Sequence, residues 1–142
     1  MLMTSSYISP FILNFILALF FQASEQHRRY VHVPTLMSWD DALKYCRANH
    51  MDLAIFRNQS EFKTQHYPCW LNRCWIGLHR DHEDPRVWTW ADGAEVSFTS
   101  WFYNEPDDLT ERCSFMWVNS WYDSDCQNTY ESLLTLTSTC CG

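Results

Sequence analysis

The sequence predicts an α+β domain in which two helices are segregated from a mostly antiparallel sheet. Three observations support this class: two early segments carry helix signals, short aromatic runs replace them beyond residue 74, and seven cysteines occur in 142 residues. Helices and strands grouped in this way are typical of α+β folds. Once a leader is set aside, a chain of this length has room for one domain with one modest core.

The first 24 residues are interpreted as a cleaved secretory signal, which leaves residues 25–136 as the domain and residues 137–142 as an irregular tail with cysteines. The apolar run at residues 11–21 is shorter than the roughly 20 residues that span a bilayer. No Lys or Arg precedes this run, so a buried helix or an uncleaved anchor is the alternative. With the signal removed, we expect an extracellular protein without membrane insertion.

The net charge excludes one class of partner, and the cysteine content indicates the cellular compartment. The formal net charge of −7 repels phosphate backbones, which excludes nucleic acid as the expected partner. A local group of carboxylates would instead favour a hard cation such as calcium. Seven cysteines behind a secretory leader predict an oxidising compartment and a disulfide framework, with one thiol left over.

Helix and strand signals alternate in the first part of the domain. Residues 30–33 predict an edge strand ended by Pro34. Ser38 can cap the next helix, whose first turn holds two aspartates. The core-facing positions of this helix recur at i, i+3, i+4 and i+7: Trp39, Ala42, Leu43 and Cys46.

The later elements are a short helix and several aromatic strands. Ser60 is predicted to cap the helix at residues 61–63, which follows the apolar run 53–56. Strands are expected at residues 75–78 and 87–90, with a turn at Asp92 and Gly93. Gly77 predicts a close backbone approach or an unusual turn. Residues 91–125 predict a long ordered loop, the kind of segment that usually holds functional residues.

Five motifs in this order resemble the C-type lectin-like domain family, from Tyr30 to about Leu136. The helix at residues 39–46 ends in a cysteine, as the first helix of that family does. The strand 75–78 (Trp-Ile-Gly-Leu) matches the core strand of the family almost letter for letter. The other three motifs are Trp88-Thr89-Trp90, then Glu105-Pro106-Asp107 with Glu111 two residues before Cys113, and Trp121-Tyr122-Asp123 three residues before Cys126.

The resemblance implies a disulfide framework. A bridge between Cys113 and Cys126 would close a short loop and restrain it by roughly 3 kcal/mol. Cys46 is expected to pair with a last cysteine, either Cys140 or Cys141, unless the tail is an altered end that lacks the native strand. A local bridge between Cys69 and Cys74 is an option, and it leaves one cysteine over.

The resemblance also implies a calcium-dependent glycan site. The expected metal and sugar ligands are Glu105, Asp107, Glu111 and Asp123, four carboxylates for an ion that takes six to eight oxygens. In the family the proline between the first two ligands is cis, which lets both flanking side chains reach one ion. Sugar hydroxyls then fill the remaining coordination positions and donate hydrogen bonds to the same carboxylates. Glycans or glycoproteins are therefore the expected partners.

Two departures from the family pattern favour an alternative. Glu105-Pro106-Asp107 combines the mannose-type and galactose-type motifs of the family, and Tyr122 replaces an asparagine ligand. A phenol with a pKa of about 10 is a poor calcium ligand, although Asp108 or Asp125 could supply an oxygen. The alternative is a calcium-independent lectin-like module that binds a protein.

No motif in the sequence predicts catalysis. Zinc-protease spacing of His and Glu, the serine nucleophile elbow and phosphate-binding loops do not occur, so the chain is not expected to be an enzyme. Cysteine and histidine spacing also gives no structural zinc pattern. Asn58-Gln59-Ser60 is an acceptor sequence for N-glycosylation at Asn58.

Overall fold

A computed structural model describes residues 7–22, 28–64, 69 and 71–136, with the backbone alone at 18–22 and 64. Helices and strands are segregated, as the α+β class predicts, and most of the sheet is antiparallel. The elements in chain order are α1 (Pro10–Gln22), β1 (Tyr30–Met37), α2 (Trp39–Ala48), β2 (Met51–Leu53), α3 (Gln59–Thr64), β3 (Cys74–Arg80), β4 (Trp88–Trp90), β5 (Cys113–Trp117), β6 (Ser120–Ser124) and β7 (Tyr130–Leu136).

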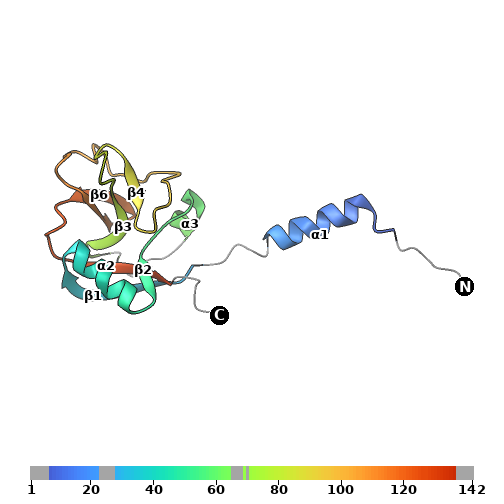
Figure 1. Ribbon diagram of the computed structural model, residues 1–142, viewed down its shortest axis with the longest axis horizontal. Coiled ribbons are helices and arrows are strands. Elements are labelled where there is room, and N and C mark those ends of the chain that lie inside the picture. Colours follow the sequence, from blue (N-terminus) through green and yellow to red (C-terminus); the bar gives the residue numbers. More distant parts are fainter. Residues whose placement is uncertain (1–6, 23–27, 65–68, 70, 137–142) are drawn as a thin grey trace, which may run out of the picture.

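The seven strands form one mixed sheet with the order β1-β7-β3-β5-β6. Strand β2 pairs with β7 outside this path, and β4 pairs with β3. The only parallel pairing between the described strands is that of β3 with β7. The last strand, β7, therefore lies between β3 and the first strand, β1, with which it pairs antiparallel. Figure 1 shows α2 lying beside β1 and β2, with β3, β4 and β6 in the other half.

Helix α2 follows the predicted pattern closely. The Ser38 side chain accepts a hydrogen bond from the Asp41 amide at 3.3 Å, which caps the helix. Trp39, Ala42 and Cys46 are buried and Leu43 packs against the same core group. The Trp39 indole also donates to the Ile76 carbonyl at 2.9 Å, which fixes the helix on β3.

Strand β1 is an edge strand, but the prediction that Pro34 ends it is wrong. The strand continues to Met37, and its register against β7 shifts between Val33 and Met37. Proline has no amide hydrogen to donate, so it is compatible with an irregularity at an edge. Pro34 therefore lies within an interrupted strand.

The cap predicted for the second helix is also wrong. Ser60 lies inside α3, and Asn58 takes the capping role: its side-chain oxygen accepts a hydrogen bond from the Glu61 amide at 2.7 Å. Asn is as good a cap as Ser, and two candidate caps two residues apart leave the choice to the tertiary fold.

Gly77 is required for a close backbone approach. Its amide donates to the Ala54 carbonyl at 2.8 Å, and its carbonyl accepts from the Ala91 amide at 2.7 Å. A Cβ at this position would lie 3.1 Å from the Leu53 carbonyl oxygen and 3.2 Å from that of Ala54. Gly77 therefore brings the segment after β2 and the end of β4 against β3, which settles the two options in favour of a close approach.

The predicted loop at 91–125 is shorter than expected, because β5 and β6 form a hairpin within it. Their register runs from Cys113 opposite Ser124 to Trp117 opposite Ser120. The irregular part is therefore residues 91–112. Cys113 and Cys126 form a disulfide with a Cα–Cα distance of 5.1 Å, which joins the start of β5 to the turn after β6.

A second disulfide joins Cys69 to Cys74, so the local bridge that the sequence left open is present. Cys46 is buried and bonds to no described cysteine, and burial raises the pKa of its thiol to about 12. Cys140 and Cys141 lie outside the described residues. The pairing of Cys46 with Cys140 stays a prediction. The last strand itself is present as β7, so the domain does not lack it.

Helix α1 covers the whole apolar run of the predicted leader. It lies apart from the folded body (Figure 1), and apolar side chains such as Phe11 and Phe15 are exposed. Among the described residues, none of the helices combines the length and apolar character needed to span a membrane.

The close approach at Gly77 gives a test of the fold. Replacing Gly77 by Ala should lower the free energy of unfolding by about 1–3 kcal/mol, because a methyl group must displace two backbone carbonyls. Urea unfolding followed by tryptophan fluorescence measures this. Gly93→Asn separates backbone strain from crowding: Gly93 has φ +83°, so a side chain there is strained, but a Cβ at this position would meet nothing within 4 Å. Equal stability of Gly77→Ala and the unmodified domain would contradict the packing described.

Candidate functional site

Three acidic side chains from two segments converge at one end of the sheet. Glu105 and Asp107 lie in the long loop on either side of Pro106, and the Glu105–Pro106 bond is cis. Asp123 lies on β6. Each of these three residues offers a carboxylate oxygen, and these oxygens lie within 4.8 Å of one another. We call Glu105, Asp107 and Asp123 the acidic cluster.

Asp123 is the buried member of the acidic cluster. Its Oδ2 accepts from Arg80 Nη2 at 3.1 Å and from the Asp108 amide at 3.3 Å, while Oδ1 accepts from the Asp107 amide at 3.3 Å. The side chains of Asp123 and Arg80 are 0% and 3% exposed, so the ion pair is screened very little by water. The Asp123 carboxylate thus holds two backbone amides of the loop and places a negative charge, paired with Arg80, on the buried side of the acidic cluster.

Arg80, at the end of β3, is a central residue that the sequence prediction missed. Its guanidinium donates to the carbonyl oxygens of Pro85 at 2.9 Å, Asp108 at 2.8 Å and Glu111 at 2.7 Å, in addition to Asp123. A signal did exist: Arg80 continues the spacing of Ile76 and Leu78 along the strand, a pattern that places all three on one face.

Glu105 holds its proton unusually strongly. Burial, a hydrogen bond with the Asp123 side chain and the negative charges of Asp123 and Asp107 raise the pKa of Glu105 to about 7. The carboxylates of the acidic cluster repel one another, and the single positive charge of Arg80 does not offset all of them. A cation that entered would favour the ionised form of Glu105.

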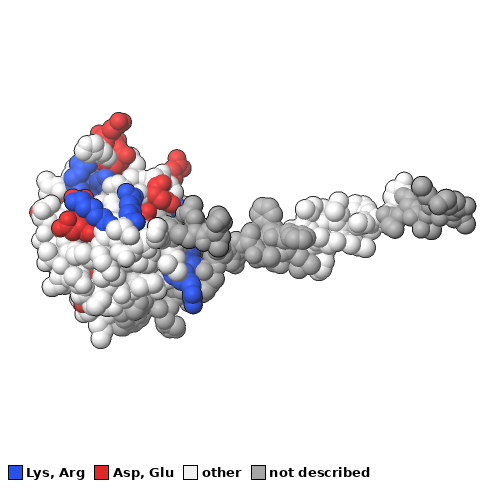
Figure 2. Space-filling model, turned by 60° about the horizontal axis from the view of Figure 1, so that its bottom comes forward, with Lys and Arg blue, Asp and Glu red and all other residues white. Residues whose placement is uncertain are grey.

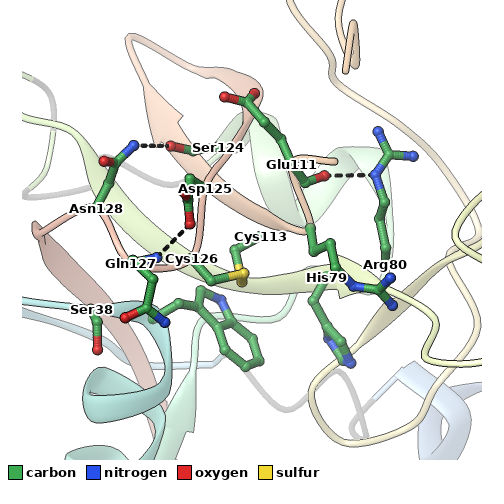
Figure 3. Close-up of a disulfide and its surroundings, with 12 residues drawn as sticks. Ser38, His79, Arg80, Glu111, Cys113, Ser124, Asp125, Cys126, Gln127 and Asn128 are labelled. Atoms are coloured by element: carbon green, nitrogen blue, oxygen red, sulfur yellow. Dashed lines mark hydrogen bonds between the residues drawn. A yellow bond between two sulfur atoms is a disulfide. The ribbon is translucent and has the colours of Figure 1, made fainter. Parts of the chain in front are cut away.

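Glu111 does not join the acidic cluster, in contrast to the predicted set of four ligands. Its backbone carbonyl meets Arg80, and its side chain points away from the guanidinium (Figure 3). Burial and the charges of Asp123 and Asp107 raise the pKa of its carboxyl, so it is still part of the same electrostatic environment. Its main structural contribution is through the backbone.

The two aspartates that could supply a further oxygen are engaged in local turns. Asp108 Oδ1 accepts from the amide and the hydroxyl of Thr110 at 2.8 and 2.7 Å. Asp125 Oδ1 accepts from the Gln127 amide at 2.9 Å (Figure 3). Neither belongs to the acidic cluster.

Tyr122 packs in an aromatic stack instead of joining the acidic cluster. Its ring lies between Phe102 and Phe115, with centroid distances of 5.2 and 5.1 Å and interplanar angles of 24° and 6°. Burial and the nearby charge of Glu105 raise the pKa of the phenol, so it is neutral at physiological pH. A neutral phenol with this packing gives the acidic cluster no anionic ligand.

The acidic cluster fits calcium in donor type and charge. When all three carboxylates are ionised, they and one guanidinium have a net charge of −2, which a divalent cation balances. Oxygen donors suit calcium, and positions that the protein does not fill are open to hydroxyls or water. The other described group with metal-binding side chains, His32 with Cys69 and Cys74, does not fit, because its cysteines form a disulfide.

Charge elsewhere on the surface is mixed. On the face shown in Figure 2, Lys and Arg side chains lie next to Asp and Glu. No broad field of either sign is seen on this face.

The raised pKa of Glu105 can be tested directly. In the calcium-free domain its carboxyl should titrate near pH 7, and Asp123→Asn should lower that pKa toward its ordinary value by removing a neighbouring negative charge. Carbon-13 NMR of the side-chain carboxyl follows the titration. Asp125→Asn is the matched control, because Asp125 is exposed and outside the acidic cluster. An unchanged Glu105 pKa in Asp123→Asn would show that the two groups are not coupled.

Comparison with known proteins identifies the family. The family model described as the lectin C-type domain matches residues 35–133. Human C-type lectin domain family 17, member A is 30% identical over 103 residues, which is 70% of this chain and 27% of that protein. The chain thus spans about a quarter of the length of this relative.

Two solved structures have the same fold. A Ca2+-dependent type II antifreeze protein in its Ca2+-free form is 25% identical, with a TM-score of 0.68 over 79% of this chain and 98% of that chain. The cow C-type carbohydrate-recognition domain of CD23, solved in the presence of a GlcNAc2Man3 oligosaccharide, is 22% identical, with a TM-score of 0.71 over 81% and 92% of the two chains. With a family model that covers most of its length, this chain belongs to the C-type lectin domain family.

Proposed function

We propose that this domain binds glycans through a calcium ion held by Glu105, Asp107 and Asp123. The observation that carries the proposal is the convergence of three carboxylates on one small volume, with a net charge of −2 when all three are ionised. Membership of a lectin domain family supports the same function.

The residues of the acidic cluster have separate roles in this proposal. A bound calcium ion would supply coordination positions that sugar hydroxyls can occupy. Asp123, held by Arg80 and two backbone amides, provides a fixed oxygen. Glu105 and Asp107, which are less buried, can contact the ion and accept hydrogen bonds from the same hydroxyls. Glu111 is assigned an electrostatic role near the site, since its side chain does not reach the acidic cluster.

A calcium-independent module that binds a protein is the second candidate. Tyr122 favours it, because its aromatic packing removes the ligand that the family places there. The stack also ends in an exposed aromatic ring at Phe102, which is 51% exposed. Aromatic side chains are enriched in protein interfaces. This candidate predicts binding that persists in a chelator.

We infer further that residues 1–24 are removed and that the domain is secreted, with Asn58 as a glycan acceptor. Two disulfides support an oxidising compartment. Asn58 is exposed, and its side-chain oxygen caps α3, so the amide nitrogen that a glycan would modify is not the capping atom.

The proposed function is tested by removing two ligands. Replacing both Glu105 and Asp107 by Ala should reduce calcium affinity by about 100-fold or more and abolish glycan binding, because two of three carboxylates are lost. Calorimetric titration with calcium and binding to a glycan array measure the two effects. The fold should be retained, since neither residue belongs to the core.

Asp125→Asn controls for general loss of acidic charge and should bind calcium and glycans as the unmodified domain does.

The dependence of calcium affinity on pH follows from Glu105. Because its pKa is raised to about 7, calcium affinity should fall as pH is lowered through that value and level off above it. Glycan binding that survives excess chelator, or the double replacement, would refute the calcium mechanism and favour the second candidate.

A further inference from the structure

Arg80 links four segments at the end of the domain that holds the acidic cluster. Its side chain extends from the end of β3 and contacts the carbonyl oxygens of Pro85 in the following turn, Asp108 in the long loop and Glu111 at the approach to β5. The fourth partner is the carboxylate of Asp123 on β6. All three guanidinium nitrogens therefore donate hydrogen bonds, and two of the acceptors lie within residues 91–112.

The surroundings of the guanidinium are those of a buried cation site. Arg80 is buried, and its guanidinium carbon lies 4.5 Å from the centroid of the Trp88 ring, in cation–π contact. Three carbonyl oxygens and one carboxylate oxygen accept from it. Carbonyl and carboxylate oxygens are also the donors that a hard metal ion takes from a folded loop. The cation here is covalently part of the chain.

This arrangement acts on the acidic cluster through Asp123. Arg80 and the Asp108 amide bind Oδ2 of Asp123, while Oδ1 accepts from the Asp107 amide. The loop is therefore attached to Asp123 by two consecutive amides, and Arg80 holds the carboxylate to which they bind. Without a positive charge at this position, only two backbone amides would offset the repulsion between an acidic loop and a buried carboxylate.

We propose that Arg80 is a positioning residue that orders the loop of residues 91–112, as a bound metal ion could, so that the acidic cluster is assembled before calcium binds. This inference rests on the proposed function for its consequence, a preformed calcium site, but loop order itself does not require calcium to bind. Calcium then meets a loop already in its final shape, because Arg80 offsets the charge of Asp123 at all calcium concentrations.

The test is amide hydrogen exchange of the full domain in excess chelator and in calcium. Two reporters are the amides of Glu105 and Glu111, which donate to the carbonyls of Phe102 and Asp108 at 3.0 and 3.1 Å. The Gly77 amide is the core reference. In the unmodified domain the reporters should be protected in chelator, and calcium should slow their exchange by less than about threefold.

Replacing Arg80 by Met should speed exchange of both reporters by about tenfold or more in chelator, and calcium should restore much of the protection. Arg86→Met is the matched control: Arg86 is exposed and pairs with Asp84 next to the same turn, so it removes the same charge without touching the loop. Arg80→Lys keeps the charge but not the three-nitrogen geometry, and intermediate protection is expected. Recovery by calcium separates positioning from a general loss of stability, which would also affect Gly77.

The unmodified domain alone can overturn the inference, even if Arg80→Met does not fold. Reporters that exchange at least about tenfold faster in chelator than in calcium would show that the ion, and not Arg80, orders the loop. Protected reporters in a domain that binds no calcium would refute the proposed function while supporting the role of Arg80. The two failures are therefore distinguishable.

Discussion

The buried ion pair between Arg80 and Asp123 is the interaction on which the functional end of the domain depends. Removing one member of such a pair typically costs about 3–5 kcal/mol, because the other charge stays buried. Here the consequences extend beyond stability. Asp123 holds two loop amides, and its charge helps to keep a proton on Glu105 near neutral pH. One contact therefore links the shape of the loop to the affinity of the acidic cluster for a cation.

Signals that act over a few residues predicted much of this structure. Ser38 and the apolar stripe of α2 act within three turns of one helix, and Gly77 lies in a strand whose apolar residues belong to the core. The resemblance to a known family supplied the longer-range assignments. It led to the Cys113–Cys126 pair and to the loop with Glu105 and Asp107, both of which bring together residues that are separated in sequence.

Features set by tertiary contact could not be predicted in this way. Asn58 and Ser60 are both good caps, and only the packed helix selects one. Glu111 has the charge expected of a ligand, yet its backbone faces Arg80. Tyr122 was expected to weaken an ion site; its ring packs between Phe102 and Phe115, which the sequence does not indicate. The spacing of Arg80 with Ile76 and Leu78 predicts that it faces the interior, but its four acceptors come from segments that the sequence alone does not bring together.

A crystal structure of the domain grown with calcium, examined by anomalous scattering, tests the central claim most directly. The account predicts one calcium peak among the carboxylates of Glu105, Asp107 and Asp123, with Arg80 still bonded to Asp123 Oδ2 and the loop unchanged. A calcium ion that displaces Arg80 from Asp123, or the absence of any peak in the acidic cluster at saturating calcium, would contradict it.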